Sequence, residues 1–526
     1  GGGTDYTRAT SFTIPADSTS YTLPVVIIDD GLGESDETII LTMTSVTGGA
    51  SVATIHATNN AQTVTITDDD AAPFTWLGTT ADGQWSTPGN WQGGTIPGAS
   101  DVALFTDACG SNCSVSVDTN VTVGGMDLQS TYTGTITQGA SSTMDIGNGG
   151  FKIAAGTYAG SAASFTQTSS SGYGFEQSGG TFTAGTGDVT FSATGSARTF
   201  FYQTAGVFTH ASGTVKFLLD GASGVQYTVD PNGTLTTNNV EVRSFGAGSN
   251  SASFKVNGGD TIRTNGTLKF GRVSGSTNIY MAGGSFSAYG DVEAEAGAVS
   301  AAGVVGGVVL LRSAGAQLYG GAGVLPSLLV MKTGGAATAS TANVSAYSLN
   351  LQSGAFEAPS GILTLLPPQS GTVFTQTSGT YTHNSGTLRF SSPSLTGSES
   401  YTVNVQIATT FNNFEIVQGG ANGTYTGAWG FSGDTYDIAG NFVIQKAASS
   451  NISVSSGTFN VGGNFTSTNL TSGNAAITLN GAGVQTVTIN GNMAPTGPVI
   501  INKASGTVEM ASAWGLYGVG QDMTLQ

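Results

Sequence analysis

The sequence predicts an all-β protein, a partial β-sandwich followed by a long right-handed parallel β-helix, and three observations lead to this prediction. A seventeen-residue phrase occurs three times, at Phe175–Phe191, Phe201–Phe217 and Phe374–Phe390. Apolar and polar residues alternate throughout, with no sustained helical period. Only 9% of the 526 residues are charged, whereas 80 are glycines. Repeats on this scale indicate a solenoid, whose units must stack to bury their apolar faces.

The segment 1–72 differs from the rest of the chain and predicts the partial sandwich. Regular strand patterns occur at Ser11–Ile14, Tyr21–Ile28, Glu37–Thr44 and Ala61–Thr67, and clusters of turn residues separate them. Strands of this length and spacing are typical of a β-sandwich. We therefore place a first domain at positions 1–72.

Half of the net charge of -18 lies in this first domain. Residues 1–70 hold ten acids against one base, Arg8, a net charge of -9. Carboxylates held close together repel one another, and Ca²⁺ takes six to eight oxygen ligands, so this density favours bound calcium. The alternative is a solvated acidic rim. The mildly acidic remainder of the chain argues against nucleic-acid binding.

Three phrases in this domain resemble the second half of a Calx-beta domain: GTDYT, then PVVIIDDGLGESDETIILTMTS, then TVTITDDD. In that family a calcium cluster lies at one end of the sandwich. An Asp pair that ends one strand, acids in the following turn and a terminal Asp run supply its ligands. The resemblance implies eight ligand candidates: Asp5, Asp29, Asp30, Glu34, Glu37, Asp68, Asp69 and Asp70.

Residues 73–120 form a transition rich in tryptophan, with Trp76, Trp85 and Trp91 close together in the chain. The segment is similar to the one that opens many autotransporter-like passenger regions before a β-helix. A solenoid exposes an apolar end and an unpaired strand edge, which bulky rings can plug. We interpret the tryptophans as a cap, and the alternative is an aromatic platform for carbohydrate stacking.

Cys109 and Cys113 are the only cysteines, separated by a Gly-Ser-Asn turn. We expect a local disulfide at a hairpin tip, which implies an oxidising, extracytoplasmic setting. Half of a metal site or a redox pair are the alternatives, but both lack further Cys or nearby His.

Residues 121–526 predict the β-helix. Besides the seventeen-residue phrase, a larger unit is visible, because the YTV at Tyr227 recurs at Tyr401 and the NNVEV at Asn238 recurs as NNFEI at Asn412. We expect Phe, Tyr, Val, Leu and Ile to point into the coil, Thr, Ser and Gln to face water, and Gly or Asn to form the corners. Coils of about 20 residues stacked about 4.8 Å apart give a rod on the order of 100 Å long.

Enzymes with this architecture need clustered acids on one lateral face, often with Lys, Arg or His. The nearest candidate is the alternating trio Asp291, Glu293 and Glu295, which we interpret as a solvated or weakly cation-binding face. His210 and His383 occupy the same place in two repeat copies and should lie several coils apart. The sequence therefore predicts a protein that is not an enzyme.

These observations favour a fragment of a large secreted bacterial surface protein, and nearly the whole chain resembles giant repeat adhesins. Its function would be structural: to project from or coat the cell and to contact other surfaces. Expected partners are other copies, other surface proteins or cell-surface glycans, without a membrane-spanning segment. The alternatives are a self-assembling filament, sheath or surface-layer subunit and, less favoured, a polysaccharide-acting enzyme.

Overall fold

The computed structural model describes most of the chain, and its regular structure is almost entirely β. The residues it describes are 6–27, 37–48, 53–66, 74–170, 172–220, 225–245, 251–273, 278–297, 307–392, 397–419, 426–446, 451–491, 494–516, 518 and 521–526. Within them lie 49 strands and three short 3-10 helices, η1 (Pro88–Asn90), η2 (Gln92–Gly94) and η3 (Asp107–Cys109).

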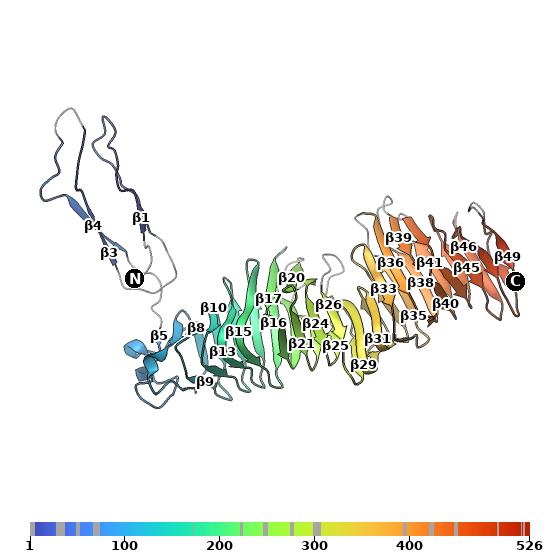
Figure 1. Ribbon diagram of the computed structural model, residues 1–526, viewed down its shortest axis with the longest axis horizontal. Coiled ribbons are helices and arrows are strands. Elements are labelled where there is room, and N and C mark those ends of the chain that lie inside the picture. The colour runs from blue at the N-terminus through green and yellow to red at the C-terminus, as the bar shows by residue number, and fades with distance from the viewer. Residues whose placement is uncertain are drawn as a thin grey trace.

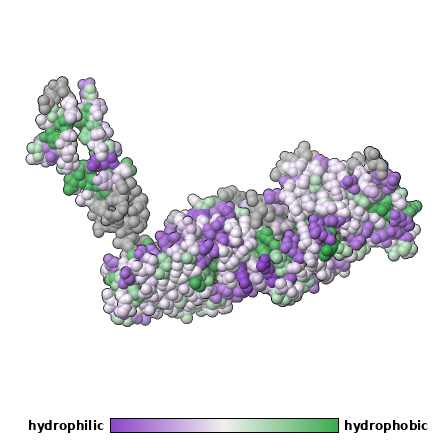
Figure 2. Space-filling view, viewed as in Figure 1, coloured by the Kyte–Doolittle hydropathy of each residue, from purple (hydrophilic) through white to green (hydrophobic). Residues whose placement is uncertain are grey.

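The N-terminal region holds two antiparallel hairpins. One pairs β1 (Tyr6–Arg8) with β2 (Val25–Ile27), and the other pairs β3 (Glu37–Thr42) with β4 (Ala61–Ile66). They form separate two-stranded sheets (Figure 1), so a closed sandwich is not seen in the described residues. Hydrophobic residues lie on their surface (Figure 2), and the side chain of Ile40 is 65% exposed.

The rest of the chain winds into a parallel β-solenoid of about 16 turns (Figure 1). The strands of its first half are β5 (Phe74–Thr75), β6 (Val102–Phe105), β7 (Val115–Val117), β8 (Val121–Leu128), β9 (Thr135–Gln138), β10 (Met144–Ile153), β11 (Thr157–Ala159), β12 (Phe165–Ser169), β13 (Phe175–Thr183), β14 (Val189–Ala193), β15 (Arg198–Thr209), β16 (Thr214–Asp220), β17 (Gln226–Asp230), β18 (Thr234–Thr237), β19 (Asn239–Phe245), β20 (Ser251–Val256), β21 (Thr261–Thr264), β22 (Leu268–Arg272), β23 (Asn278–Gly283), β24 (Ser285–Ala288) and β25 (Val292–Ala294).

The strands of its second half are β26 (Val308–Leu311), β27 (Gln317–Gly320), β28 (Val324–Leu325), β29 (Ser327–Ala339), β30 (Val344–Ala346), β31 (Leu349–Glu357), β32 (Ile362–Leu365), β33 (Gly371–Gln376), β34 (Thr380–Thr382), β35 (Thr387–Ser392), β36 (Glu399–Val405), β37 (Thr410–Phe411), β38 (Asn413–Gln418), β39 (Thr426–Gly430), β40 (Thr435–Ile438), β41 (Phe442–Lys446), β42 (Asn451–Ser455), β43 (Thr458–Val461), β44 (Phe465–Thr468), β45 (Ala476–Leu479), β46 (Gln485–Asn490), β47 (Val499–Ile501), β48 (Val508–Met510) and β49 (Met523–Leu525).

Each coil pairs in parallel with the next, but most coils are longer than the sequence predicted. Phe414 pairs with Phe442 across one long coil, whereas Val344 pairs with Leu363 across one of the shortest. The turns between strands take more chain than expected, so fewer coils fit into the same sequence. About 16 turns at about 4.8 Å give a stack of roughly 75 Å, shorter than expected.

The seventeen-residue phrase places aromatic rings of adjacent coils on top of one another. Its first two copies lie in adjacent coils, where Phe175 pairs with Phe201 and Phe182 with Phe208. The ring centroids are 4.8 and 5.1 Å apart and nearly parallel. These separations are close to the distance between neighbouring strands, so each ring lies directly on its counterpart. The inward direction predicted for the aromatic residues is confirmed here.

The expectation that glutamine faces water is wrong for the repeat. Gln177, Gln203 and Gln376 are at most 9% exposed. The Gln177 side-chain amide donates to the carbonyls of Gly179 and Val207, at 3.2 and 3.1 Å, and Gln203 donates to the Gln177 oxygen at 3.1 Å. A coil corner leaves carbonyls without ladder partners, and a buried carboxamide satisfies them.

Two later corners use a lysine for the same purpose. Lys332, 2% exposed, donates from Nζ to the carbonyls of Ser313 and Gly315 at 2.9 and 2.8 Å. Lys503 approaches the Gly483 carbonyl and the Gln485 side chain at 2.9 and 2.7 Å. Burial lowers the pKa of both lysines, which have only neutral partners among these contacts.

The third copy of the phrase lies on a different ladder from the first two. Its first strand, β33, continues the ladder of β31, β29, β26, β24, β21 and β18. The corresponding strand of the second copy, β15, pairs instead with β17, which precedes β18 in the same coil. Equivalent residues of the larger repeat therefore recur on a neighbouring face of the solenoid.

Buried tyrosines should make the solenoid sensitive to alkali, and Tyr227 provides the test. Burial raises its pKa to about 12, and its hydroxyl donates to the Gly195 carbonyl at 3.1 Å. Because the folded pKa exceeds the ordinary value of 10.0, the stabilisation is complete below pH 10 and is lost between pH 10 and 12. Tyr227→Phe should cost about 1 kcal/mol at pH 7. Urea unfolding should show this difference shrinking above pH 10; a difference that stays constant up to pH 12 would contradict the assignment.

Candidate functional site

The tryptophans of the transition segment are buried in the first coils. Trp76, Trp85 and Trp91 are each at most 1% exposed and pack around Phe105. Trp91 meets Trp76 and Trp85 edge to face, at 5.1 and 4.7 Å between centroids. Rings enclosed in this way have no face free for sugar stacking, so the arrangement is that of a plug and not of a carbohydrate platform.

Polar groups hold the plug in place. The Trp91 indole donates to the Trp85 carbonyl at 2.9 Å. Asn90, fully buried, donates to the Asp82 carboxylate at 2.6 Å and accepts from the Thr80 amide at 3.0 Å. Hydrogen bonds from Gln84, Thr87 and Asn90 lower the pKa of Asp82. The polar groups of the loop that carries the tryptophans thus find hydrogen-bond partners within the loop itself.

Cys109 and Cys113 form a disulfide beside this plug, with their Cα atoms 4.9 Å apart. The loop it closes is fastened at two further points. The Trp76 indole donates to the Asn112 carbonyl at 3.1 Å, and the Tyr132 hydroxyl donates to the Cys113 carbonyl at 2.5 Å. The disulfide therefore fixes local geometry at the start of the solenoid.

Seven of the eight proposed calcium ligands lie outside the described residues: Asp5, Asp29, Asp30, Glu34, Asp68, Asp69 and Asp70. For the eighth, Glu37, the structure describes only the backbone, which begins β3 and pairs with Ile66. Among the described residues no cluster of three or more His, Cys, Asp or Glu side chains could hold a metal ion.

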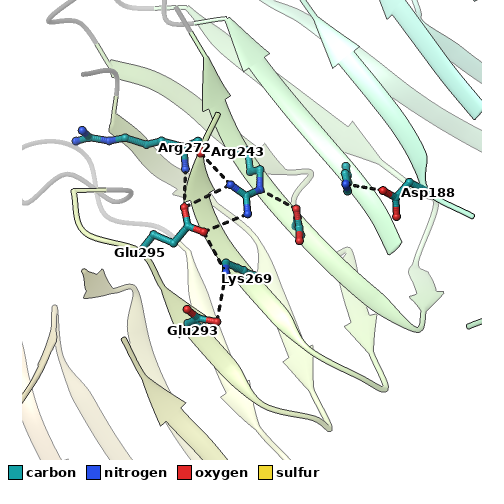
Figure 3. Close-up of polar contacts among 8 residues, drawn as sticks. Asp188, Arg243, Lys269, Arg272, Glu293 and Glu295 are labelled. Atoms are coloured by element: carbon teal, nitrogen blue, oxygen red, sulfur yellow. Dashed lines mark hydrogen bonds and ion pairs between the residues drawn. The ribbon is translucent and has the colours of Figure 1, made fainter. Parts of the chain in front are cut away.

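A strip of paired charges runs across four coils on one lateral face (Figure 3). Its central column is Lys216 on β16, Glu241 on β19, Lys269 on β22 and Glu293 on β25, each paired in register with the next. Charge alternates along the column, so every neighbouring coil brings an opposite sign. Because like charges directly opposite one another on a sheet are unfavourable, this order stabilises the stack.

Glu295 is the centre of the strip (Figure 3). Its carboxylate lies 3.1 Å from Arg243 and 3.0 Å from Lys269, and it accepts from the Arg272 amide at 3.2 Å. Burial raises the pKa of Glu295, but these three partners outweigh it and hold the pKa below its ordinary value of 4.5. The hydrogen bond from Lys269 to Glu295 raises the lysine's pKa in turn.

The acid trio predicted to share one face is therefore divided among different partners. Glu293 and Glu295 pair with Lys269, at 3.5 and 3.0 Å. Asp291 instead accepts from the backbone amide of Leu318 in the following coil at 2.8 Å. A solvated or weakly cation-binding face was expected, but two of the carboxylates neutralise bases of the preceding coils. Those bases are too distant along the chain for sequence spacing to reveal the contacts.

The larger repeat carried a signal for such pairs that sequence reasoning missed. Arg389 and Glu415 correspond in the repeat to Lys216 and Glu241, and each couple is matched in register across adjacent coils. Arg389 lies 2.6 Å from Glu415. A basic and an acidic residue recurring together, one coil apart, is the pattern that could have predicted the contact.

The histidines do not meet. His210 follows β15, and His383 follows β34, whose ladder includes β31 and the last residues of β29. The ring nitrogen of His383 accepts from the Ser385 amide at 2.9 Å, and His56 accepts from Thr58 and Asn59. These rings thus bond to residues of their own turns. His210 and His383 were expected to lie several coils apart.

Three hollows with polar lining residues open among the described residues of the solenoid. The Gln203 hollow, about 270 Å³, lies between β15 and β18, and the Gln376 hollow, about 400 Å³, lies between β34 and β37. They occupy equivalent places in the larger repeat. The Thr338 hollow, about 350 Å³, lies at the turns that follow β29, β31 and β34.

Removing the carboxylate at the centre of the charged strip should destabilise the fold more than removing one at its exposed edge. Glu295→Gln should cost about 1–3 kcal/mol of unfolding free energy, because it leaves Arg243 and Lys269 without their shared partner. Glu293→Gln, at a side chain 47% exposed, is the matched control and should cost under about 0.5 kcal/mol.

The pH dependence of the two variants distinguishes this pairing from simple packing. A depressed pKa gives Glu295 a stabilisation that is complete above pH 4.5 and is lost as the pH falls through its folded value. The difference between wild type and Glu295→Gln in urea unfolding should therefore shrink below pH 4.5. Equal effects of both variants at every pH would contradict the network.

No family model, curated protein or solved structure matches this chain.

Proposed function

We propose that this chain is a structural, non-enzymatic part of an extracellular bacterial surface protein. In this proposal the solenoid is a stiff spacer that projects from or coats the cell and contacts other surfaces. The supporting observation is the continuous parallel stack of about 16 turns, in which rings and buried amides align from coil to coil. No helix among the described residues is long and apolar enough to cross a membrane.

The charged groups support a structural protein over a catalytic one. The carboxylates of the strip, Glu241, Glu293 and Glu295, are all paired with bases, and the pKa of Glu295 is lowered. This shift is opposite to that of a glycosidase's acid, whose pKa is raised. Burial does raise the pKa of two carboxyl groups outside the strip, Asp127 and Asp260, but they lie several coils apart. The disulfide at the plug suits an oxidising environment outside the cytoplasm.

A second candidate is a self-assembling filament. Only 9% of the residues are charged. Apolar side chains on strands of the solenoid are also exposed, such as Val207 at 52% and Leu318 at 44%. A weakly charged solenoid with exposed apolar side chains can pair laterally with another copy.

Electron microscopy of the whole protein, with and without EDTA, tests the first candidate against the second. Isolated rods whose solenoid measures roughly 75 Å, from about 16 turns at about 4.8 Å, are the expected result. Ordered fibres or sheets with a regular subunit repeat would overturn the spacer in favour of the filament.

Calcium in the first domain is a further part of the proposal. Its support is the donor chemistry, since all eight candidates are carboxylates, the oxygen ligands that Ca²⁺ prefers. The hairpin registers add to it: Tyr6, next to Asp5, pairs with Ile27, and Ile66 pairs with Glu37. The bound ion would neutralise the acids and stiffen the joint between this domain and the solenoid.

EDTA should therefore speed proteolysis of the joint between positions 65 and 80. Asp30→Asn combined with Asp69→Asn should make cleavage in Ca²⁺ as fast as that of the wild type in EDTA, because binding stabilises only the folded form. Asp17→Asn, in an exposed turn, is the control and should leave cleavage unchanged. Cleavage rates that do not respond to EDTA would sink the calcium proposal.

A further inference from the structure

The parallel sheet is interrupted beside β34. On one side β34 pairs with β31, with Thr380 opposite Ala355 and Thr382 opposite Glu357. In the next coil β37 pairs with β40 and begins a separate six-stranded sheet. The Gln376 hollow occupies this interruption, between β34 and the segment 407–410. One edge of β34 therefore borders an open polar space instead of another strand.

Threonine hydroxyls, the Gln376 amide and the His383 ring give the wall of the Gln376 hollow its hydrogen-bonding groups. Thr380, Thr382 and Thr410 line it with exposed side chains, and none of these hydroxyls has a hydrogen-bond partner among the described residues. Gln376 is held below them, because its side-chain oxygen accepts from the Thr409 hydroxyl at 2.9 Å. The lining thus combines free hydroxyls with a positioned amide.

The Thr338 hollow continues this surface at the other end of β34. Its polar lining includes Ser340, Ser360 and Asn384, all exposed and uncharged, and alanines and a proline complete it. Asn384 donates to the Ala358 carbonyl at 2.9 Å, which orients its side-chain oxygen. His383 lines the Gln376 hollow and its neighbour Asn384 lines the Thr338 hollow, so one short oligosaccharide can reach both.

One carboxylate lies in register between a lining residue of each hollow, although it is not itself among the lining residues. Glu357 pairs in register with Thr338 on one side and with Thr382 on the other. It accepts from the Thr338 hydroxyl at 3.0 Å and has no basic partner among the described residues. A carboxylate accepts hydrogen bonds from sugar hydroxyls but repels another carboxylate.

We propose that the two hollows flanking β34 bind an uncharged oligosaccharide. Hydroxyls and an amide supply the paired donors and acceptors that sugar hydroxyls require, and Glu357 selects against acidic sugars. The inference rests on the proposed surface-contact function and names its ligand class and location. The Gln203 hollow is the repeat counterpart of the Gln376 hollow and offers a second, smaller site through Asn232, Thr234 and Thr236.

The test measures retention of the full-length protein on immobilised neutral trisaccharides, namely cellotriose, mannotriose and N-acetylchitotriose, with trigalacturonic acid as the acidic probe. Thr410→Tyr fills the Gln376 hollow, and Thr234→Tyr fills the Gln203 hollow; both positions are exposed, and aromatic residues suit strands. Thr402→Tyr is the matched control, on an exposed position of β36 outside these three hollows.

We expect the wild type to bind at least one neutral trisaccharide and not the acidic one. Thr410→Tyr should lower the affinity at least tenfold, Thr234→Tyr should remove a weaker component, and Thr402→Tyr should bind like the wild type. Failure of every neutral probe, preference for the acidic probe, or binding insensitive to Thr410→Tyr would each overturn the inference. Rods in the electron microscope combined with no sugar binding would defeat this inference alone, whereas fibres would defeat the spacer.

Discussion

The spacing between neighbouring parallel strands is the constraint on which the rest of this structure depends. Strands about 4.8 Å apart place equivalent side chains of successive coils almost directly over one another. Flat rings tolerate this distance well, as Phe175 on Phe201 and Phe182 on Phe208 show. Because the rings stack only when the register is kept, the same contacts that bury apolar surface also fix the pairing of these coils.

The corners need polar partners instead of apolar ones. Their carbonyls turn away from the ladders and still require hydrogen-bond donors. The chain supplies buried carboxamides at Gln177, Gln203 and Gln376, and ammonium groups at Lys332 and Lys503. Residues that look solvent-facing in the sequence thereby become part of the interior.

The architecture could be predicted from the sequence because alternation and repetition are local. The inward aromatic residues and the long stack followed from the spacing of Phe, Gly and Thr. The burial of the glutamines could not be predicted in this way. The alternation of inward and outward residues gives no sign of a corner, where the backbone turns and a residue expected to face water can point inward. The partners of Glu295 were also beyond reach, since Arg243 and Lys269 come from earlier coils, and coils of unequal length hide which residues face each other.

The register also decides how the lateral hollows can act together. If the coils had kept one length, Gln203 and Gln376 would open on the same face and could grip one flat surface side by side. The third copy of the phrase instead continues the ladder of β18, which is not the ladder of β15. Two sites on different faces cannot both contact one rigid flat surface, so they gain no avidity from it. They suit a flexible polymer that can pass around the solenoid.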